Sequence, residues 1–152
     1  MTSVRTMLGV ALLAVAGATG CAAQADGPPE IALDRDACSH CGMLISEARH
    51  AAAFRAADGT MRVFDDIGCL RDAAGGNNAA ERIWVHDSVD ASWIDAGEAT
   101  FVVSPDIRTP MAGGVLAFRH AADAEGAAVT CHGRVIRSMS DVLSIERKGA
   151  GS

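Results

Sequence analysis

The stretch MRVFDDIGCLRDAA, residues 61–74, decides the fold. Residues 61–64 form a short apolar run interrupted by one Arg, which is typical of a β-strand. Asp65 and Asp66 follow it. Because a carboxylate ahead of an apolar run favours a helix N-terminus, we expect a helix over residues 67–74, ended by Gly75 and Gly76. The stretch therefore predicts a strand that passes directly into a helix.

Further strands are expected on both sides of this stretch. Asp58-Gly59 is a hairpin-type turn, so the apolar residues 51–54 are expected to pair with the strand at 61–64. Residues 43–45 and 83–86 read as two more strands. The last four elements of this half are predicted in the order strand, strand, helix, strand.

A second stretch of the chain has the same order. It predicts a strand over residues 99–103, a loop over 104–114 and a second strand over 115–118. A helix over 121–131, which Gly133 ends, and a short strand over 134–136 follow. In each half, a strand ending in Phe leads into an Ala-rich helix that contains a Cys. This pattern is compatible with an internal duplication but does not establish one. This order favours an α+β fold over a doubly wound parallel sheet.

The first twenty residues have the pattern of an export signal. After Arg5, an apolar run extends from Met7 to Ala18 and is too short to span a bilayer comfortably. Ala18-Thr19-Gly20 leads into Cys21, which resembles the lipobox of bacterial lipoproteins, although Ala18 stands where leucine is usual. The alternative is ordinary secretory cleavage near Ala22. In either case we predict an exported protein.

The domain organisation follows from these signals. We predict a signal peptide over residues 1–20, lipidation at Cys21, a linker over 21–30, one module over 31–90, a second over 91–140 and a tail over 141–152. The net charge of −6 argues against a nucleic-acid binder, and the 49% hydrophobic content argues against wholesale disorder. No second long apolar segment follows, so membrane attachment is expected through the lipid anchor only.

The cysteines suggest the chemistry. Four remain if Cys21 is lipidated, and an even number in an exported chain usually indicates disulfides. Cys69 and Cys131 lie in apolar helical context, where a buried thiol or one disulfide is expected rather than metal binding. Cys38 and Cys41 differ, because the hexapeptide 38–43, CSHCGM, also contains an imidazole and a thioether.

Two roles, that of a thioredoxin-like exchange motif and that of a structural zinc site, fit this hexapeptide poorly. Thiol–disulfide exchange motifs place the first Cys at a helix start, whereas a strand is expected after Cys41. A structural zinc site needs a second ligand pair at suitable spacing, and only Cys131-His132 is available. Thiolate and thioether donors together favour Cu(I). A second candidate thioether is Met111, in a turn set by Pro110 and the following glycines.

Several blocks together resemble the NosL family of copper-binding lipoproteins. They are C-x-x-C-G-M-x-I at 38–45, FDDIGC at 64–69, VHD at 85–87, WIDA at 93–96, and TPM at 109–111 leading to Ala117-Phe118. The resemblance implies two small ββαβ modules. It also implies a periplasmic metallochaperone that serves maturation of nitrous oxide reductase in denitrification.

The resemblance further implies what the protein binds and where it works. It would hold Cu(I) and pass it towards the copper–sulfur centre of nitrous oxide reductase, through a membrane-associated assembly and ABC transport complex. The implied metal ligands are Cys41, Met43 and Met111, with Cys38 as a close candidate. His86 and His120 are weaker candidates. The expected location is the periplasmic side of the envelope, lipid-anchored, and the outer membrane if the cell is Gram-negative.

No catalytic constellation is recognisable, so no enzymatic turnover is expected. Two alternatives stay open. The fold that the resemblance implies is similar to that of organomercurial lyases, which use a cysteine pair and an acid, so a lyase or a soft-metal scavenger is one. The other is an envelope lipoprotein whose cysteines are all disulfide-bonded.

Overall fold

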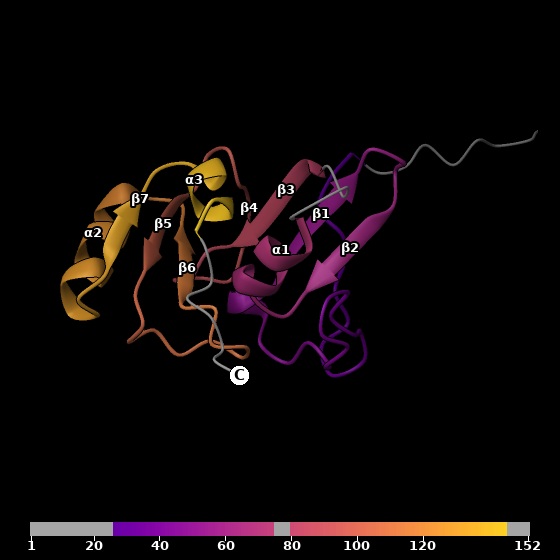
Figure 1. Ribbon diagram of the computed structural model, residues 1–152, viewed down its shortest axis with the longest axis horizontal. Helices are drawn as coiled ribbons and strands as arrows, with labels where there is room; N and C mark the ends of the chain where they lie inside the picture. The colour runs from indigo at the N-terminus through magenta and orange to yellow at the C-terminus, as the bar shows by residue number, and fades with distance from the viewer. Residues whose placement is uncertain (1–25, 75–79, 146–152) are drawn as a thin grey trace, which may run out of the picture.

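The computed structural model describes residues 26–74 and 80–145 (Figure 1). The predicted signal peptide, the lipidation site Cys21, the glycines at 75 and 76 and the end of the predicted tail lie outside the described residues. The described chain folds into two antiparallel sheets with three α-helices and a short 3-10 helix, η1 (Ala48–His50). The predicted α+β class is confirmed in its coarse form, since the fold combines two antiparallel sheets with a few helices.

The first sheet is built around the hairpin predicted from the sequence. It has the strand order β2-β1-β3-β4, with bounds β1 (Ala52–Ala56), β2 (Met61–Phe64), β3 (Ala80–His86) and β4 (Trp93–Asp95). The turn between β1 and β2 contains Gly59 at φ +83°, which a residue with a side chain rarely adopts. Helix α1 (Ile67–Ala74) follows β2 directly and contacts both β1 and β2, as the sequence predicted.

The second sheet has the order β6-β5-β7, formed by β5 (Thr100–Val103), β6 (Val115–Phe118) and β7 (Arg134–Ile136). Helix α2 (Ala121–Thr130) contacts all three strands, and α3 (Met139–Leu143) packs against α1 and β7. In Figure 1 the two sheets lie side by side along the long axis, with α1 on the first and α2 on the far end of the second. The backbone N–H of Ser88, just after β3, donates to the carbonyl of Ala117 at 2.9 Å and so joins the two sheets.

One predicted strand is wrong, and two short elements were not predicted. Residues 43–45 form no strand: Met43 and Leu44 are exposed, and Leu44 makes a single bridge with Ala37. Strand β4 and helix α3 were not predicted, because three and five residues are too short to show a period. Cys131, expected as the last residue of a helix over 121–131, follows the end of α2.

The hydrophobic core draws on both sheets. Phe54 and Phe64 pack with ring centroids 5.2 Å apart, and Phe101 and Val115 from the second sheet belong to the same cluster. A smaller cluster around Val102 lies against α2. Because one core spans the two sheets, the segments that carry the candidate ligands are fixed relative to each other.

His86, at the end of β3, is a buried structural residue. Its Nδ1 lies 2.9 Å from the carbonyl oxygen of Ala51, which can only accept, so Nδ1 carries the proton. Its ring packs against Trp93 at a centroid distance of 3.6 Å. Burial lowers the pKa of His86 below the ordinary histidine value, because the charged imidazolium loses its hydration.

We expect the free energy of unfolding to fall as the pH drops through about 6.5. A lowered folded-state pKa contributes stability above the unfolded-state pKa, and protonation of the unfolded chain removes it in acid. His86→Gln, whose amide can still donate to Ala51, should show a smaller decrease between about pH 7.5 and about pH 5 in urea denaturation. Some decrease will remain because burial also lowers the pKa of His50. Equal decreases in the two proteins would contradict the assignment to His86.

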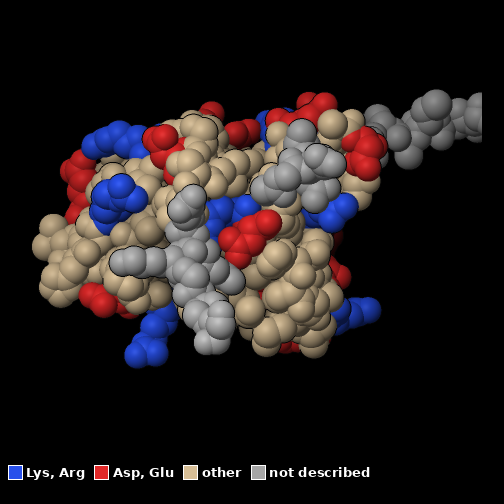
Figure 2. Space-filling model, in the orientation of Figure 1, with Lys and Arg blue, Asp and Glu red and all other residues tan. Residues whose placement is uncertain are grey.

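The exposed surface carries charges of both signs. On the face drawn in Figure 2, acidic and basic side chains are interspersed among uncharged residues. Such a face does not offer the continuous basic stripe that a nucleic-acid phosphate backbone requires. Within residues 26–74 and 80–145, no helix combines the length and the apolar character needed to cross a bilayer.

Candidate metal site

Two adjacent aspartates at the junction of β2 and α1 have different roles. The Asp66 carboxylate accepts a hydrogen bond from the backbone N–H of Cys69 at 2.7 Å and so caps α1, as predicted. Asp65 was also expected to serve as a helix cap. Instead, its carboxylate accepts from the thiol of Cys41, with the sulfur 3.8 and 3.9 Å from its two oxygens. The helix start therefore provides one capping carboxylate and one that faces the thiols.

The turn that carries Cys38 and Cys41 is closed by its own backbone. The N–H of Cys38 donates to the carbonyl of Met43 at 2.8 Å, and the N–H of Gly42 donates to the carbonyl of Cys38 at 2.9 Å. Gly42 adopts φ +78°, which favours glycine at this corner. Ser39 exchanges hydrogen bonds with the backbone of Val63, so the turn is docked on β2.

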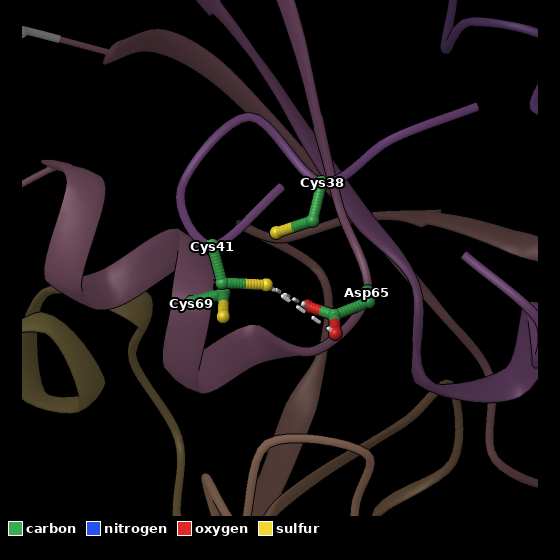
Figure 3. A group of neighbouring side chains, drawn as sticks. All are labelled: Cys38, Cys41, Asp65 and Cys69. Atoms are coloured by element: carbon green, nitrogen blue, oxygen red, sulfur yellow. Dashed lines mark hydrogen bonds between the residues drawn. The ribbon is translucent and has the colours of Figure 1, made fainter. Parts of the chain in front are cut away.

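The turn and the helix bring three thiols and one carboxylate together. The Sγ atoms of Cys38, Cys41 and Cys69 and a carboxylate oxygen of Asp65 all lie within 4.8 Å of one another. Figure 3 shows the two thiols of the turn, the thiol on α1 and the Asp65 carboxylate directed into one space. We call these four residues the thiol group. All four cysteines in the described residues are free. Of the two roles expected for Cys69 and Cys131, a buried thiol or one disulfide, the disulfide is therefore absent there, and Cys69 is a buried thiol.

Access to the thiol group is unequal. Cys38 and Cys69 are 2% and 1% exposed, whereas Cys41 is half-buried. A ligand or reagent from solvent therefore meets the sulfur of Cys41 first. The buried pair provides a water-poor interior in which soft metal–sulfur bonds do not compete with hydration.

Burial and neighbouring groups set the protonation of these thiols. Burial raises the pKa of Cys38, the Asp65 side chain adds to the rise, and backbone hydrogen bonds from Cys41, Asp65 and His40 oppose it. Burial also raises the pKa of Cys69 strongly, and the carboxylates of Asp65 and Asp66 add to this. Both thiols therefore keep their protons at neutral pH until a metal ion displaces them.

The two methionines predicted as ligands come from different segments, Met43 from the cysteine turn and Met111 from the loop between β5 and β6. Met43 follows Cys41 in the same turn, and its side chain is 57% exposed. Met111 is half-buried and packs against the same core as Cys38 and Cys69. The structure thus brings Cys38 and Cys41 together and leaves Met43 at the surface beside them. That both methionines bind the metal stays a prediction.

Asp66 ties the Met111 loop to α1. One of its oxygens accepts from the hydroxyl of Thr109 at 2.7 Å and from the backbone N–H groups of Met111 and Gly113, each at 3.2 Å. The approach is close: a Cβ on Gly68 would lie 2.6 Å from the Cα of Gly113. One buried carboxylate therefore fixes the backbone of both Cys69 and Met111.

The two histidine candidates lie apart from the thiol group. His86 is occupied by its hydrogen bond to Ala51, and His120 is exposed at the start of α2. Two members of the thiol group were not predicted from the sequence as parts of the site: Asp65, next to the thiol of Cys41, and Cys69. Their spacing carried the signal, because residues four apart at a helix start project from the same side.

Sequence and structure comparisons bear on this arrangement. The family model of NosL matches residues 30–143, three quarters of the chain. The chain belongs to the NosL family. The crystal structure of the copper chaperone NosL from Shewanella denitrificans is similar, with a TM-score of 0.61 at 22% identity over 73% of this chain and 93% of that one. This similarity shows a shared fold. No curated protein is detectably similar in sequence.

Family membership and the thiol group together support copper binding by this NosL-family chain. The Shewanella denitrificans NosL is a copper chaperone, and NosL is a family of copper chaperones and not of enzymes. The matched residues include every member of the thiol group as well as Met43 and Met111.

Proposed function

We propose that this protein is a periplasmic Cu(I) metallochaperone that supplies copper for the copper–sulfur centre of nitrous oxide reductase. The observation that carries the proposal is the convergence of three free thiols within 4.8 Å. Cu(I) is a soft d¹⁰ ion that accepts low coordination by thiolate and thioether sulfur. The donor set of Cys38, Cys41 and Cys69, with the proposed thioethers of Met43 and Met111, matches that preference.

The gradient of burial suggests how copper is passed on. Cys38 and Cys69 hold the ion in the interior, and Cys41 is open on one side. The exposed Met43 provides a soft donor at the surface, two residues from Cys41. A partner's sulfur ligand can therefore enter before the last thiolate leaves, which keeps the number of soft bonds nearly constant during exchange.

The cellular setting is part of the same proposal. A lipid anchor at Cys21 and a linker over residues 21–30 would hold the carrier at the periplasmic face of the envelope, next to the membrane-associated assembly and ABC transport machinery of the reductase. The order β1-β2-α1-β3, followed by β5-β6-α2-β7, supports the description of the fold as two tandem ββαβ modules.

Anaerobic competition with a chromophoric Cu(I) chelator tests the proposal. The reduced protein should take up one equivalent of Cu(I), and the loaded protein should restore the copper centre of the apo-reductase when its assembly machinery is present. Failure to compete for Cu(I) would refute the copper-carrier function. An organomercurial offered to the reduced protein should be recovered uncleaved, and cleavage would instead favour the lyase alternative.

We expect the affinity for Cu(I) to rise with pH. The raised pKa values of Cys38 and Cys69 mean that binding must displace protons, and each proton released changes the affinity by about tenfold per pH unit. Chelator competition at several pH values between about 6 and about 9 measures the slope. An affinity independent of pH would mean that neither buried thiol loses a proton on binding.

A further inference from the structure

We propose that Cys38 and Cys41 are a reversible modification site: the two thiols form a disulfide by exchange with a disulfide oxidant, and the oxidised pair excludes Cu(I). The exclusion of Cu(I) rests on the proposed function. The disulfide itself rests on geometry alone, so the two can fail separately.

The pairing follows from the elements that carry the three thiols. Cys38 and Cys41 lie in one short turn, and their sulfurs are already within 4.8 Å of each other. A disulfide between them therefore needs side-chain rotation and little backbone movement. Cys69 is fixed differently, because its backbone N–H is held by Asp66 at the start of α1. The sulfur of Cys69 lies within the same distance, but pairing with it would link two separate elements, the turn and α1, and not two residues of one turn.

The difference in access sets the order of the steps. The sulfur of the half-buried Cys41 attacks an external disulfide, R–S–S–R, forming a mixed disulfide and releasing one R–S⁻. The sulfur of Cys38 then attacks Cys41 in the mixed disulfide, forming the Cys38–Cys41 bond and releasing the second R–S⁻. Two protein thiols lose two electrons and two protons, and the oxidant is reduced to two thiols.

Cys38 is the thiol placed to complete the exchange. It lies three residues from Cys41 in the same backbone-closed turn, and it is buried, so the mixed disulfide on Cys41 meets its sulfur from the interior.

Oxidation and copper loading then exclude each other. The disulfide removes two of the three thiolates, and a single thiol beside the hard oxygen of Asp65 is a poor Cu(I) site. Conversely, Cu(I) bound at Cys41 covers the sulfur that must attack the oxidant.

Tryptic mapping can identify the pairing directly. Cleavage after Arg places Cys38 and Cys41 together in peptide 36–49, Cys69 in peptide 63–71 and Cys131 in peptide 120–134. Reduced protein is incubated anaerobically with oxidised glutathione, with and without one equivalent of Cu(I), then alkylated and digested. We expect peptide 36–49 to lose two hydrogen atoms and escape alkylation, with peptides 63–71 and 120–134 alkylated. Prior Cu(I) should protect peptide 36–49.

Two Cys→Ser variants and a measurement of Cu(I) affinity before and after oxidation complete the test. Cys38→Ser should stop at a glutathione adduct on Cys41, and Cys131→Ser should oxidise like wild type. The oxidised wild type should bind Cu(I) more than about 100-fold more weakly and recover after reduction. A crosslink between peptides 36–49 and 63–71, or a fully alkylated peptide 36–49, would overturn the pairing. Unchanged Cu(I) binding by the disulfide form would overturn the exclusion. If the reduced protein fails to bind Cu(I), the proposed function fails while the peptide map still decides the disulfide.

Discussion

Replacing Cys69 with Ser weakens Cu(I) binding by more than about 100-fold. Losing a residue that only hydrogen-bonds to a metal ligand costs about 10–100-fold in metal affinity, and losing the ligand itself should cost more. Cys69 contributes a buried sulfur to the thiol group from α1. Serine keeps the shape but offers a hard oxygen, which Cu(I) binds poorly. The measurement is anaerobic competition with a chromophoric chelator.

Cys131→Ser is the matched control. Cys131 is also a free cysteine, half-buried and at the end of α2, but it lies outside the thiol group. Its replacement should leave the Cu(I) affinity unchanged. If Cys69→Ser binds like wild type while Met111→Ala binds weakly, the site consists of Cys41 and the methionines, and the thiol on α1 is only a packing residue.

Local sequence predicts the elements that carry this site but not the contact between them. The strand–Asp-Asp–helix signal at 61–74 correctly predicted β2, the Asp66 cap and α1, because each depends on residues within one turn of the chain. The contact between Cys69 and the turn at 38–43 depends instead on how β2 and the turn dock through Ser39 and Val63. No single segment encodes that docking.

The wrong strand at residues 43–45 has a related cause. Met43, Leu44 and Ile45 form an apolar run, but only Ile45 is buried. An apolar run predicts a strand when its side chains are expected in the core. At a candidate functional site, exposed apolar side chains such as Met43 break that expectation, and the same exposure makes Met43 available to a partner.

Replacing Asp66 with Asn destabilises the protein by about 1.5–3 kcal/mol, because at least the hydrogen bond from the N–H of Cys69 to a charged acceptor is lost. The Asp66 carboxylate is 1% exposed and accepts from Cys69, Thr109, Met111 and Gly113. When the amide oxygen takes the place of the oxygen that Thr109, Met111 and Gly113 contact, the NH₂ faces the N–H of Cys69, which can only donate. Urea denaturation of the apo-protein measures the loss. Asp90→Asn, an exposed aspartate that accepts from the N–H of Ser92, should leave stability essentially unchanged.

The hydrogen bonds that Asp66 accepts from the Met111 loop should also couple this loop to copper binding. Thr109→Val removes the hydroxyl that donates to Asp66 and accepts from the N–H of Gly113, so it loosens the loop with less risk of unfolding. If binding of Cu(I) by the Met111 thioether depends on these hydrogen bonds, Met111→Ala lowers the Cu(I) affinity in the wild-type background and has little further effect in the Thr109→Val background. Equal effects in both backgrounds would mean that Met111 binds copper independently of Asp66. No effect in either would remove Met111 from the site and leave the three thiols to hold the ion alone.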